Sequence, residues 1–406
     1  MPGKPRIAIV TPFLDKRHGT ERCVAEQVER LASDYEIHVY SNRLEDVDPG
    51  KIVWHRVPAL PGPHLFAYGW WIIANHWYRW RDRRFRGLKY DLTYTPGINC
   101  FDADVISVHI VFAEYYSRVR RALGFRGNPV RSWPQLLHRR IYYRLVIALE
   151  RMIYGWGKAV LTVVSARVGR ALERYGRGRS HLVVIVHGID VQRFNVETRQ
   201  RLRDSARSRL GLKESDFCLL LIGNDWINKG LPCLLEALAR LEAASVRLLV
   251  VGRDTAEPYR ETIEWLHMED RVMFLPVRPD VEIYYAAADL YVGPSLEDAF
   301  GLPPLEAMAC GVPCIVSRQT GVSGIVTPGV EGFVLEDPQD SDKLANLIAR
   351  LFASRRLREL MGVAATQTAQ KYTWDRNARQ LDQVFRDVLQ RKGSEPVAVA
   401  SEQSTR

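Results

Sequence analysis

The chain has 406 residues, of which 47% are hydrophobic and 26% charged, and its formal net charge is +10. This composition excludes a disordered chain, and the length favours two domains. No stretch offers the eighteen uncharged apolar residues of a spanning helix, and the apolar run Ile7–Val10 stops at Pro12, unlike a signal peptide. The positive charge favours an anionic partner, such as a nucleotide, an acidic glycan, a membrane surface or nucleic acid.

The six cysteines are scattered along the chain, at positions 23, 100, 218, 233, 310 and 314. Only Cys310 and Cys314 lie close in sequence, and neither has a second Cys or a His nearby at a spacing typical of zinc sites. We therefore expect reduced thiols in a cytosolic protein.

The chain begins with a strand, a loop and a helix. Ile7–Thr11 reads as a buried strand, and the helix from Glu21 carries Val24, Val28 and Leu31 on one face. Gly19 and Thr20 at the helix start would direct backbone N–H groups toward a ligand. The pattern is weak alone, because many α/β folds contain one. Strands at 36–40 and 52–57 follow.

Two regions combine tryptophan and tyrosine with arginine, at residues 64–86 and 118–158. Seven of the ten tryptophans fall between residues 54 and 156, so the bias belongs to the first half. Basic helices with interfacial aromatics suit an anionic bilayer surface. The alternatives are core helices with solvated arginines, or a site for single-stranded nucleic acid. We disfavour nucleic acid because no such binding fold is readable.

Two polar features follow in the first half. Asp102 and Asp104 have the form of an Asp-x-Asp metal motif, but they directly precede the apolar strand 105–108, and we discount them. His109 ends that strand. A lone histidine is often structural, yet ligands bind at the carboxyl ends of central strands, so His109 is a candidate site residue.

The second half opens with strand 218–222, loop 223–230 and helix 231–241. Lys229 would sit at a helix N-terminus, where a cation opposes the helix dipole unless an anion neutralises both. The alternative is a solvated lysine that points away from any site. Further strands are expected at 246–251, 272–275, 286–292, 312–316 and 332–334. Helices should cover 341–352 and 356–371, and Gly321 and Gly324 should form a flexible loop.

Residues 293–313 combine a loop, a short helix and a closing Gly-x-Pro after a buried strand. Asp298 lies in the loop and Glu306 in the helix. A carboxylate in each place can accept hydrogen bonds from vicinal hydroxyls, those of a ribose for one and of a hexose for the other. The alternative is that Asp298 caps a turn and Glu306 is a solvated helix residue.

This stretch resembles the Glu-x7-Glu motif of the retaining family 4 (group 1) glycosyltransferases. The matching positions are Phe300, Gly301, Leu302, Glu306, Ala307, Met308, Ala309, Gly311 and Pro313. Asp298 departs from the family's usual Glu, which shortens the reach of one carboxylate and leaves the donor sugar open. The resemblance spans about residues 6–390.

The resemblance also implies roles for other residues. Lys229 matches a family Lys that holds the donor diphosphate, whereas Asn224 occupies the place of its partner Arg, a gap shared with some lipopolysaccharide-core glucosyltransferases. The Gly19 loop would face the donor phosphates or the acceptor, and His109 would contact the donor sugar. Residues 277–281, which include Arg278, would face the base. Phe300, Gly301 and Leu302 would lie at the nucleotide sugar.

The resemblance implies an α/β fold of GT-B type, with two facing Rossmann-like domains and a cleft between them. The expected parts are an acceptor-side domain (1–190), a linker (191–213), a nucleotide-sugar domain (214–371), a closing helix that returns to the first domain (372–392) and a disordered tail (393–406). The enzyme would need no metal or cofactor and would lie in the cytoplasm, on the inner face of the membrane.

The implied reaction moves a hexose from a UDP- or GDP-linked sugar to a hydroxyl of a glycan or lipid-linked acceptor, with retention of anomeric configuration. His109, Asp298 and Glu306 would be catalytic. Two alternatives stay open: a nucleotide-sugar epimerase of the same fold, and a membrane-associated scaffold with a decayed site.

Overall fold

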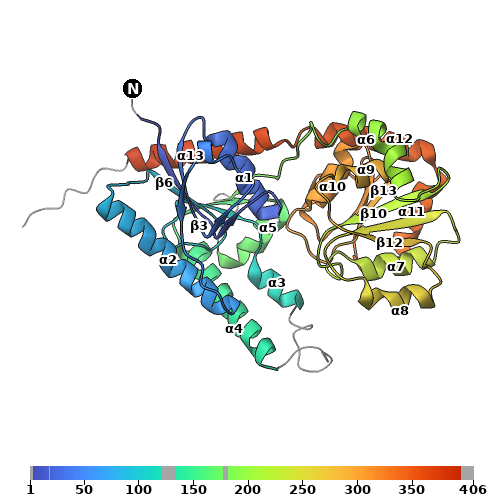
Figure 1. Ribbon diagram of the computed structural model, residues 1–406, viewed down its shortest axis with the longest axis horizontal. Coiled ribbons are helices and arrows are strands. Elements are labelled where there is room, and N and C mark those ends of the chain that lie inside the picture. The colour runs from blue at the N-terminus through green and yellow to red at the C-terminus, as the bar shows by residue number, and fades with distance from the viewer. Residues whose placement is uncertain (1–2, 18, 120–132, 177–181, 395–406) are drawn as a thin grey trace, which may run out of the picture. The chain divides into compact units, whose positions relative to one another are not determined.

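The computed structural model describes residues 3–17, 19–119, 133–176 and 182–394. The chain divides into two compact units (Figure 1). The N-terminal unit comprises Met1–Thr162, Leu172–Ile185 and Ala378–Arg406, and the C-terminal unit comprises Val163–Ala171 and Val186–Asn377. Each is built on its own sheet with helices, so the expected pair of Rossmann-like folds is confirmed.

The sheet of the N-terminal unit has seven strands. Their spatial order is β5 (Val53–Arg56), β3 (Glu36–Ser41), β1 (Arg6–Val10), β6 (Leu92–Pro96), β7 (Val105–Val108), β8 (Val160–Val163) and β9 (Leu182–Val184). The pairings from β5 through β7 are parallel. Two short strands, β2 (Phe13–Leu14) and β4 (Arg43–Leu44), pair separately.

The helices of the N-terminal unit are α1 (Gly19–Leu31), α2 (His64–Phe85), α3 (Phe112–Val119) and α4 (Trp133–Glu150), with short helices at Pro49–Lys51, Arg151–Trp156 and Glu173–Tyr175. Helix α5 (Ala166–Leu172) belongs, except for its last residue, to the C-terminal unit. As the spacing predicts, Val24, Val28 and Leu31 of α1 are buried against the β1 side chains. Helix α13 (Trp374–Ser394) adds Phe385 to this core, and Tyr35 donates a hydrogen bond to Asp382 at 2.6 Å.

The C-terminal unit contains a six-stranded parallel sheet. Its order is β12 (Val272–Leu275), β11 (Val246–Val251), β10 (Phe217–Ile222), β13 (Leu290–Gly293), β14 (Cys314–Ser317) and β15 (Gly332–Leu335). Its helices are α6 (Val196–Arg209), α7 (Leu231–Ala239), α8 (Glu257–Trp265), α9 (Glu282–Ala287), α10 (Leu302–Ala309), α11 (Ser341–Ala353) and α12 (Arg355–Ala369), with η5 at Gly321–Gly324. The central strands β10, β13 and β14 are buried at every position, as expected for parallel strands covered by helices on both faces.

The structure corrects the expected linker at 191–213, because most of it forms helix α6. The apolar period is poor since α6 is anchored by arginines. Arg199, Arg203 and Arg207 donate to the backbone oxygens of residues 286–288, where helix α9 ends. These oxygens have no partner within their own helix, and cations are favoured there.

Three smaller expectations are also wrong. The start of the strand expected at 286–292 belongs to helix α9, and strand β13 begins only at Leu290. The loop at Gly321 and Gly324 is a 3-10 turn whose first three residues are buried, and a Cβ on Gly321 would lie 2.2 Å from the Ala299 oxygen. Helix α13 continues to Ser394, and the remainder of the expected tail, 395–406, lies outside the described residues.

In both sheets, successive strands are added on one side of the unit's first strand, and the chain then crosses over and adds the later strands on the other side. In the N-terminal unit β1 lies between β3 and β6, and in the C-terminal unit β10 lies between β11 and β13. Open α/β sheets bind ligands beyond the carboxyl ends of the two strands at such a switch point. The six cysteines are all buried, and none of them forms a disulfide, which agrees with the expected thiols.

Candidate functional site

The loop between β13 and α10 lies at the switch point of the C-terminal unit. Gly301 caps the helix N-terminus with a φ of 93°, which a glycine adopts without strain. Phe300 is buried, and Leu302 begins the helix. The backbone of this loop is fixed by bonds from Val322 N to Phe300 O at 2.7 Å and from Asp298 N to Gln319 O at 3.1 Å. The loop is therefore preformed, with a helix N-terminus at its end.

Glu306 is buried, with 4% of its surface exposed, so its assignment as a solvated helix residue is wrong. The hydroxyl of Tyr285 in helix α9 donates to Glu306 Oε2 at 2.6 Å. Tyr285 is itself fully buried, and burial together with the Glu306 charge raises its pKa well above the usual value. Tyr285 thus stays a hydrogen-bond donor that fixes the orientation of the Glu306 carboxylate.

Lys229 and Asp298 form an ion pair, with Nζ 2.5 Å from Oδ2. Their side chains are 18% and 20% exposed, so the alternative of a solvated Lys229 is wrong. Gly230 follows with a φ of 80°, and a Cβ there would lie 2.1 Å from the Pro294 oxygen. This close approach holds Lys229 beside the loop that carries Asp298. Asp298 also accepts from Phe300 N at 3.3 Å, as the turn-capping alternative required.

The structure places the remaining predicted residues of this unit at loop surfaces. Asn224 is exposed, and its Oδ1 accepts a hydrogen bond from Arg253 N at 3.0 Å. Its side-chain amide therefore helps to orient the loop that follows β11. Arg278 follows β12, is exposed, and pairs with Asp280 at 2.9 Å. The Asp280 carboxylate raises the pKa of the Arg278 guanidinium.

Sequence reasoning missed the residues that connect the two loops of this site. Asn228 donates from Nδ2 to Glu297 O at 2.8 Å and accepts from Leu296 N at 2.7 Å. Arg167 of helix α5 donates to Glu297 Oε2 at 2.5 Å and to Gln319 O at 2.9 Å. Arg167 is far from the loop in sequence, and only the fold brings the two together.

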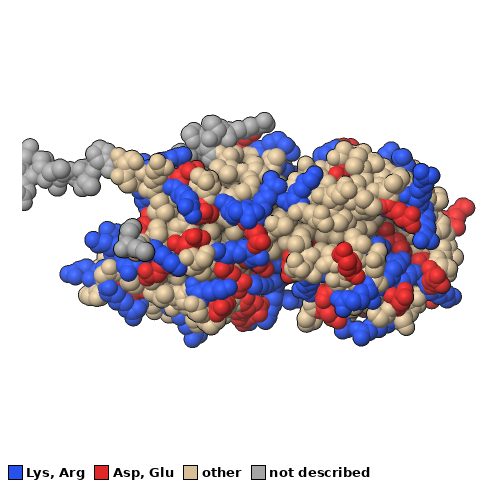
Figure 2. Space-filling view, turned by 90° about the horizontal axis from the view of Figure 1, so that it is seen from above, with Lys and Arg blue, Asp and Glu red and all other residues tan. Residues whose placement is uncertain are grey.

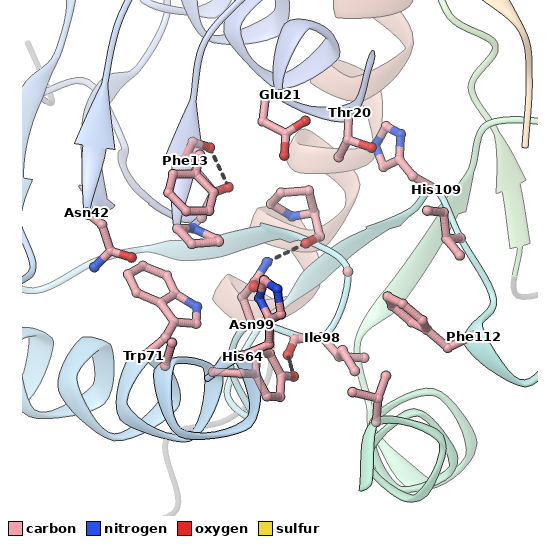
Figure 3. A pocket seen from close by; sticks show the side chains of 18 of the residues that line it. Phe13, Thr20, Glu21, Asn42, His64, Trp71, Ile98, Asn99, His109 and Phe112 are labelled. Carbon is pink, nitrogen blue, oxygen red and sulfur yellow. Dashed lines mark hydrogen bonds between the residues drawn. The ribbon is translucent and has the colours of Figure 1, made fainter. Parts of the chain in front are cut away.

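The N-terminal unit has a separate pocket of about 430 Å³ at its own switch point (Figure 3). It is lined by residues that follow β1, β3, β6 and β7, together with side chains from α1, α2 and α4. His109 lines this pocket, is 5% exposed, and has Nε2 3.1 Å from Ser107 Oγ. Gly19 begins helix α1, and the next two residues, Thr20 and Glu21, line the pocket.

Asp102 and Asp104 are engaged in structural contacts. Arg79 donates to both oxygens of Asp102 at 2.7 Å. Asp104 accepts from Thr93 N at 2.8 Å and from Lys392 at 2.9 Å, which ties β6 to helix α13. Both carboxylates therefore hold elements of the N-terminal unit together.

Two family models match consecutive parts of the chain and together cover most of it. Residues 17–193 match "Glycosyltransferase Family 4", and residues 203–368 match "Glycosyl transferases group 1". The chain therefore belongs to the group 1, or family 4, glycosyltransferases.

Among curated relatives, the D-inositol 3-phosphate glycosyltransferase of Corynebacterium urealyticum is 30% identical over 251 residues, which is 59% of this chain and 59% of that protein. The chain thus spans only about three fifths of that relative's length. The lipopolysaccharide glucosyltransferase WaaG of Escherichia coli is 28% identical over 358 residues, 86% of each chain.

Solved structures show the same fold over nearly the whole chain. WaaG, a glycosyltransferase involved in lipopolysaccharide biosynthesis, superposes with a TM-score of 0.76 at 21% identity and covers 93% of this chain and 99% of its own. Anabaena Alr3699/HepE, solved with UDP and glucose, gives 0.69 at 20% identity, over 94% and 100%. At these identities the likeness establishes the fold.

Proposed function

We propose that this protein transfers a hexose from a nucleoside diphosphate sugar, UDP- or GDP-linked, to a hydroxyl of a glycan or lipid-linked acceptor, with retention at the anomeric carbon. The observation that carries the proposal is the Lys229–Asp298 pair on the loops after the adjacent strands β10 and β13, followed eight residues later by the buried Glu306 of helix α10. This grouping lies within the part of the chain that matches the group 1 model.

Each residue has a role that its setting supports. Glu306, oriented by Tyr285, accepts hydrogen bonds from ribose hydroxyls. The N-terminus of α10 at Gly301 and Leu302, with Phe300 packed beneath, receives the diphosphate, and Lys229 supplies positive charge to it. When the donor binds, Asp298 releases Lys229 and accepts hydrogen bonds from the hydroxyls of the donor hexose.

The remaining candidates complete the proposed donor contacts. Asn224 offers neutral amide hydrogen bonds in place of a second cation, and Arg278 lies on the segment assigned to the base. In the N-terminal unit, Gly19 opens the helix toward the pocket, and His109 is assigned to the donor sugar. No step in this scheme calls on a metal or cofactor, because charge, dipoles and positioning can supply the stabilisation.

The comparisons do not favour a nucleotide-sugar epimerase, since the relatives named above are glycosyltransferases. The intact contacts of Lys229 and Glu306 argue against a decayed scaffold. A donor screen by thermal shift tests the proposal, because a bound nucleotide sugar raises the melting temperature. Donor hydrolysis by the purified protein, with NMR of the product's anomeric proton, then tests transfer and retention. A protein that neither binds nor cleaves any donor refutes the proposal.

A second part of the proposal concerns the membrane surface. Helix α2 is buried along one face by Trp71, Ala74 and Asn75, yet its other face carries exposed apolar side chains at helical spacing: Phe66, Trp70, Ile73, Trp77 and Trp80. Exposed apolar stripes of this kind mark binding surfaces. No helix within the described ranges is long and apolar enough to cross a membrane.

Helix α4 packs beside α2, with the rings of Tyr68 and Tyr142 6.2 Å apart, and it exposes Leu137, Ile141 and Leu145. Residues 120–132 of the second aromatic region lie outside the described part of the chain. Over the face seen in Figure 2, basic and acidic side chains are interspersed. We therefore propose that apolar insertion by α2 and α4, aided by the net charge, places the enzyme on an anionic membrane, at the inner face in the cytoplasm.

Vesicle sedimentation tests this surface. Ile73→Glu should reduce binding to vesicles with 30% anionic lipid by about tenfold, because it replaces an apolar side chain in the middle of the stripe with a charge. The free energy lost is that of burying one large apolar side chain, roughly 1–3 kcal/mol. Val363→Glu, an equally exposed apolar position on α12, is the matched control. Equal binding by the Ile73 variant and the control would refute the surface.

A further inference from the structure

The pocket of the N-terminal unit differs in character from the charged loops of the C-terminal unit. Among the residues that the structure describes, its lining contains no lysine or arginine and has one carboxylate, that of Glu21. Aromatic side chains form much of the wall, including Phe13, Tyr68 and Trp71. Its volume of about 430 Å³ is in the range of small-molecule sites.

The start of helix α1 would ordinarily be an anion site, because its first N–H groups are unpaired within the helix. Here Glu21 stands in the first turn, and Figure 3 shows its carboxylate directed into the pocket. A carboxylate in that place interacts favourably with the helix dipole and repels a second anion. A phosphate or carboxylate group entering the pocket would therefore meet like charge and no cationic side chain from the lining.

Trp71 provides a second, independent sign of the ligand. Its side chain is 3% exposed, and its Nε1–H has no acceptor in the structure. Figure 3 shows the nitrogen edge of the indole turned toward the pocket. A buried donor without an acceptor destabilises the folded state, and a ligand oxygen that reached it after a small side-chain shift would satisfy it.

We propose that this pocket binds the acceptor as a neutral sugar ring and rejects phosphorylated or acidic acceptors. Glu21 accepts hydrogen bonds from the acceptor hydroxyls, the Trp71 indole donates one, and the aromatic wall covers the apolar face of the ring. The inference rests on the proposed glycosyl transfer, and it separates this chain from a relative named for an inositol phosphate.

Matched acceptor pairs test it: a methyl hexoside with its 6-phosphate, a methyl heptoside with its phosphate, and inositol with inositol phosphate. The donor is the nucleotide sugar selected in the thermal-shift screen. We expect kcat/KM for at least one neutral member to exceed that of its phosphorylated partner by tenfold or more. Donor hydrolysis without acceptor is measured in parallel, because its absence would refute the proposed function itself.

Two variants assign the selectivity to this pocket. Glu21→Gln should lower the neutral-to-phosphate ratio at least fivefold, whereas Glu26→Gln, a carboxylate on the same helix that pairs with Arg30, should not change it. Trp71→Phe should raise KM for the neutral acceptor about fivefold with kcat little changed, and Trp265→Phe, at an exposed tryptophan of α8, is its control. An enzyme that cleaves the donor yet uses the phosphorylated members, or neither member of any pair, overturns the inference. So does an unchanged ratio in Glu21→Gln.

Discussion

The ion pair between Lys229 and Asp298 gives the sharpest test of the donor site, because its two members should respond in opposite directions. If Lys229 binds the donor diphosphate, it must leave Asp298 first. Lys229→Ala removes the cation, whereas Asp298→Asn removes only its competitor. The probe is UDP or GDP without a sugar, so that a contact of Asp298 with the hexose does not enter.

The magnitudes follow from the geometry. A charge-assisted bond from Lys229 to phosphate contributes about 1.5–3 kcal/mol. Breaking the pair at 2.5 Å, with both side chains mostly but not fully buried, takes back about 1 kcal/mol. Lys229→Ala should therefore weaken nucleoside diphosphate binding by about 0.5–2 kcal/mol, roughly two- to thirtyfold, and Asp298→Asn should tighten it by roughly fivefold.

Calorimetry at low and high salt measures both effects, and added salt should reduce both because part of each is screened Coulomb attraction. The double variant tells whether the gain in Asp298→Asn acts through Lys229, in which case it disappears. Circular dichroism melting of each variant controls for folding. Unchanged affinity in a folded Lys229→Ala protein would place the phosphates elsewhere, with Arg253 as the next candidate.

Three further predictions concern single residues. Glu306→Ala should abolish transfer and weaken nucleoside diphosphate binding more than Asp298→Ala does. It should also lower the unfolding free energy by about 1–3 kcal/mol, because Tyr285 loses its acceptor in the core, and Glu306→Gln should largely restore this stability but not the activity. Full activity in either Glu306 variant would contradict the assignment. Asn224→Arg should tighten diphosphate binding, by an amount that falls with salt in calorimetry, and no gain would mean that the loop is aimed elsewhere. Burial lowers the pKa of His55 to about 4 although Asp82 lies 3.1 Å away, so between pH 6.5 and 4 the unfolded chain binds a proton at His55 that the folded chain does not. The unfolding free energy should therefore fall by about 1–2 kcal/mol as the pH drops from 6.5 toward 4. Urea unfolding of a His55→Gln variant should not show this contribution.

The sequence located the parts of the donor site that depend on local chain geometry. Strand β13, the loop with Asp298 and the helix with Glu306 are contiguous, so periodicity and glycine placement define them. It could not show that Lys229 pairs with Asp298, because that contact joins two loops whose proximity depends on the adjacency of β10 and β13. It could not foresee the burial of Glu306 either, since Tyr285 lies on a helix whose alanine-rich end reads as a strand.

Helix α6 shows a second limit of pattern reading. Its residues are almost wholly polar, and an apolar stripe is the usual sign of a packed helix. It is held instead by arginine bonds to the carbonyl oxygens at the end of α9, and by the Arg203–Asp289 pair at 2.5 Å. Such contacts leave no period in the sequence, because each arginine could equally be solvated. The same uncertainty applied to Lys229, and in both cases only the fold identifies the partner.

The loop from Pro294 to Gly301 combines these contacts into one property of the site. It carries two adjacent acids, and each is paired with a cation from a different segment: Glu297 with Arg167, and Asp298 with Lys229. The loop is thus held in place by charge before any donor arrives. Donor binding under our proposal breaks only the Lys229 pair, while Arg167 and the Asn228 bonds keep the backbone fixed. Arg167→Ala should therefore lower kcat and weaken donor binding without removing any group that touches the nucleotide, and Arg167→Lys should restore part of both. If Arg167→Ala affected thermal stability alone, the loop would be held by its backbone bonds, and the charge pairing would have no part in catalysis.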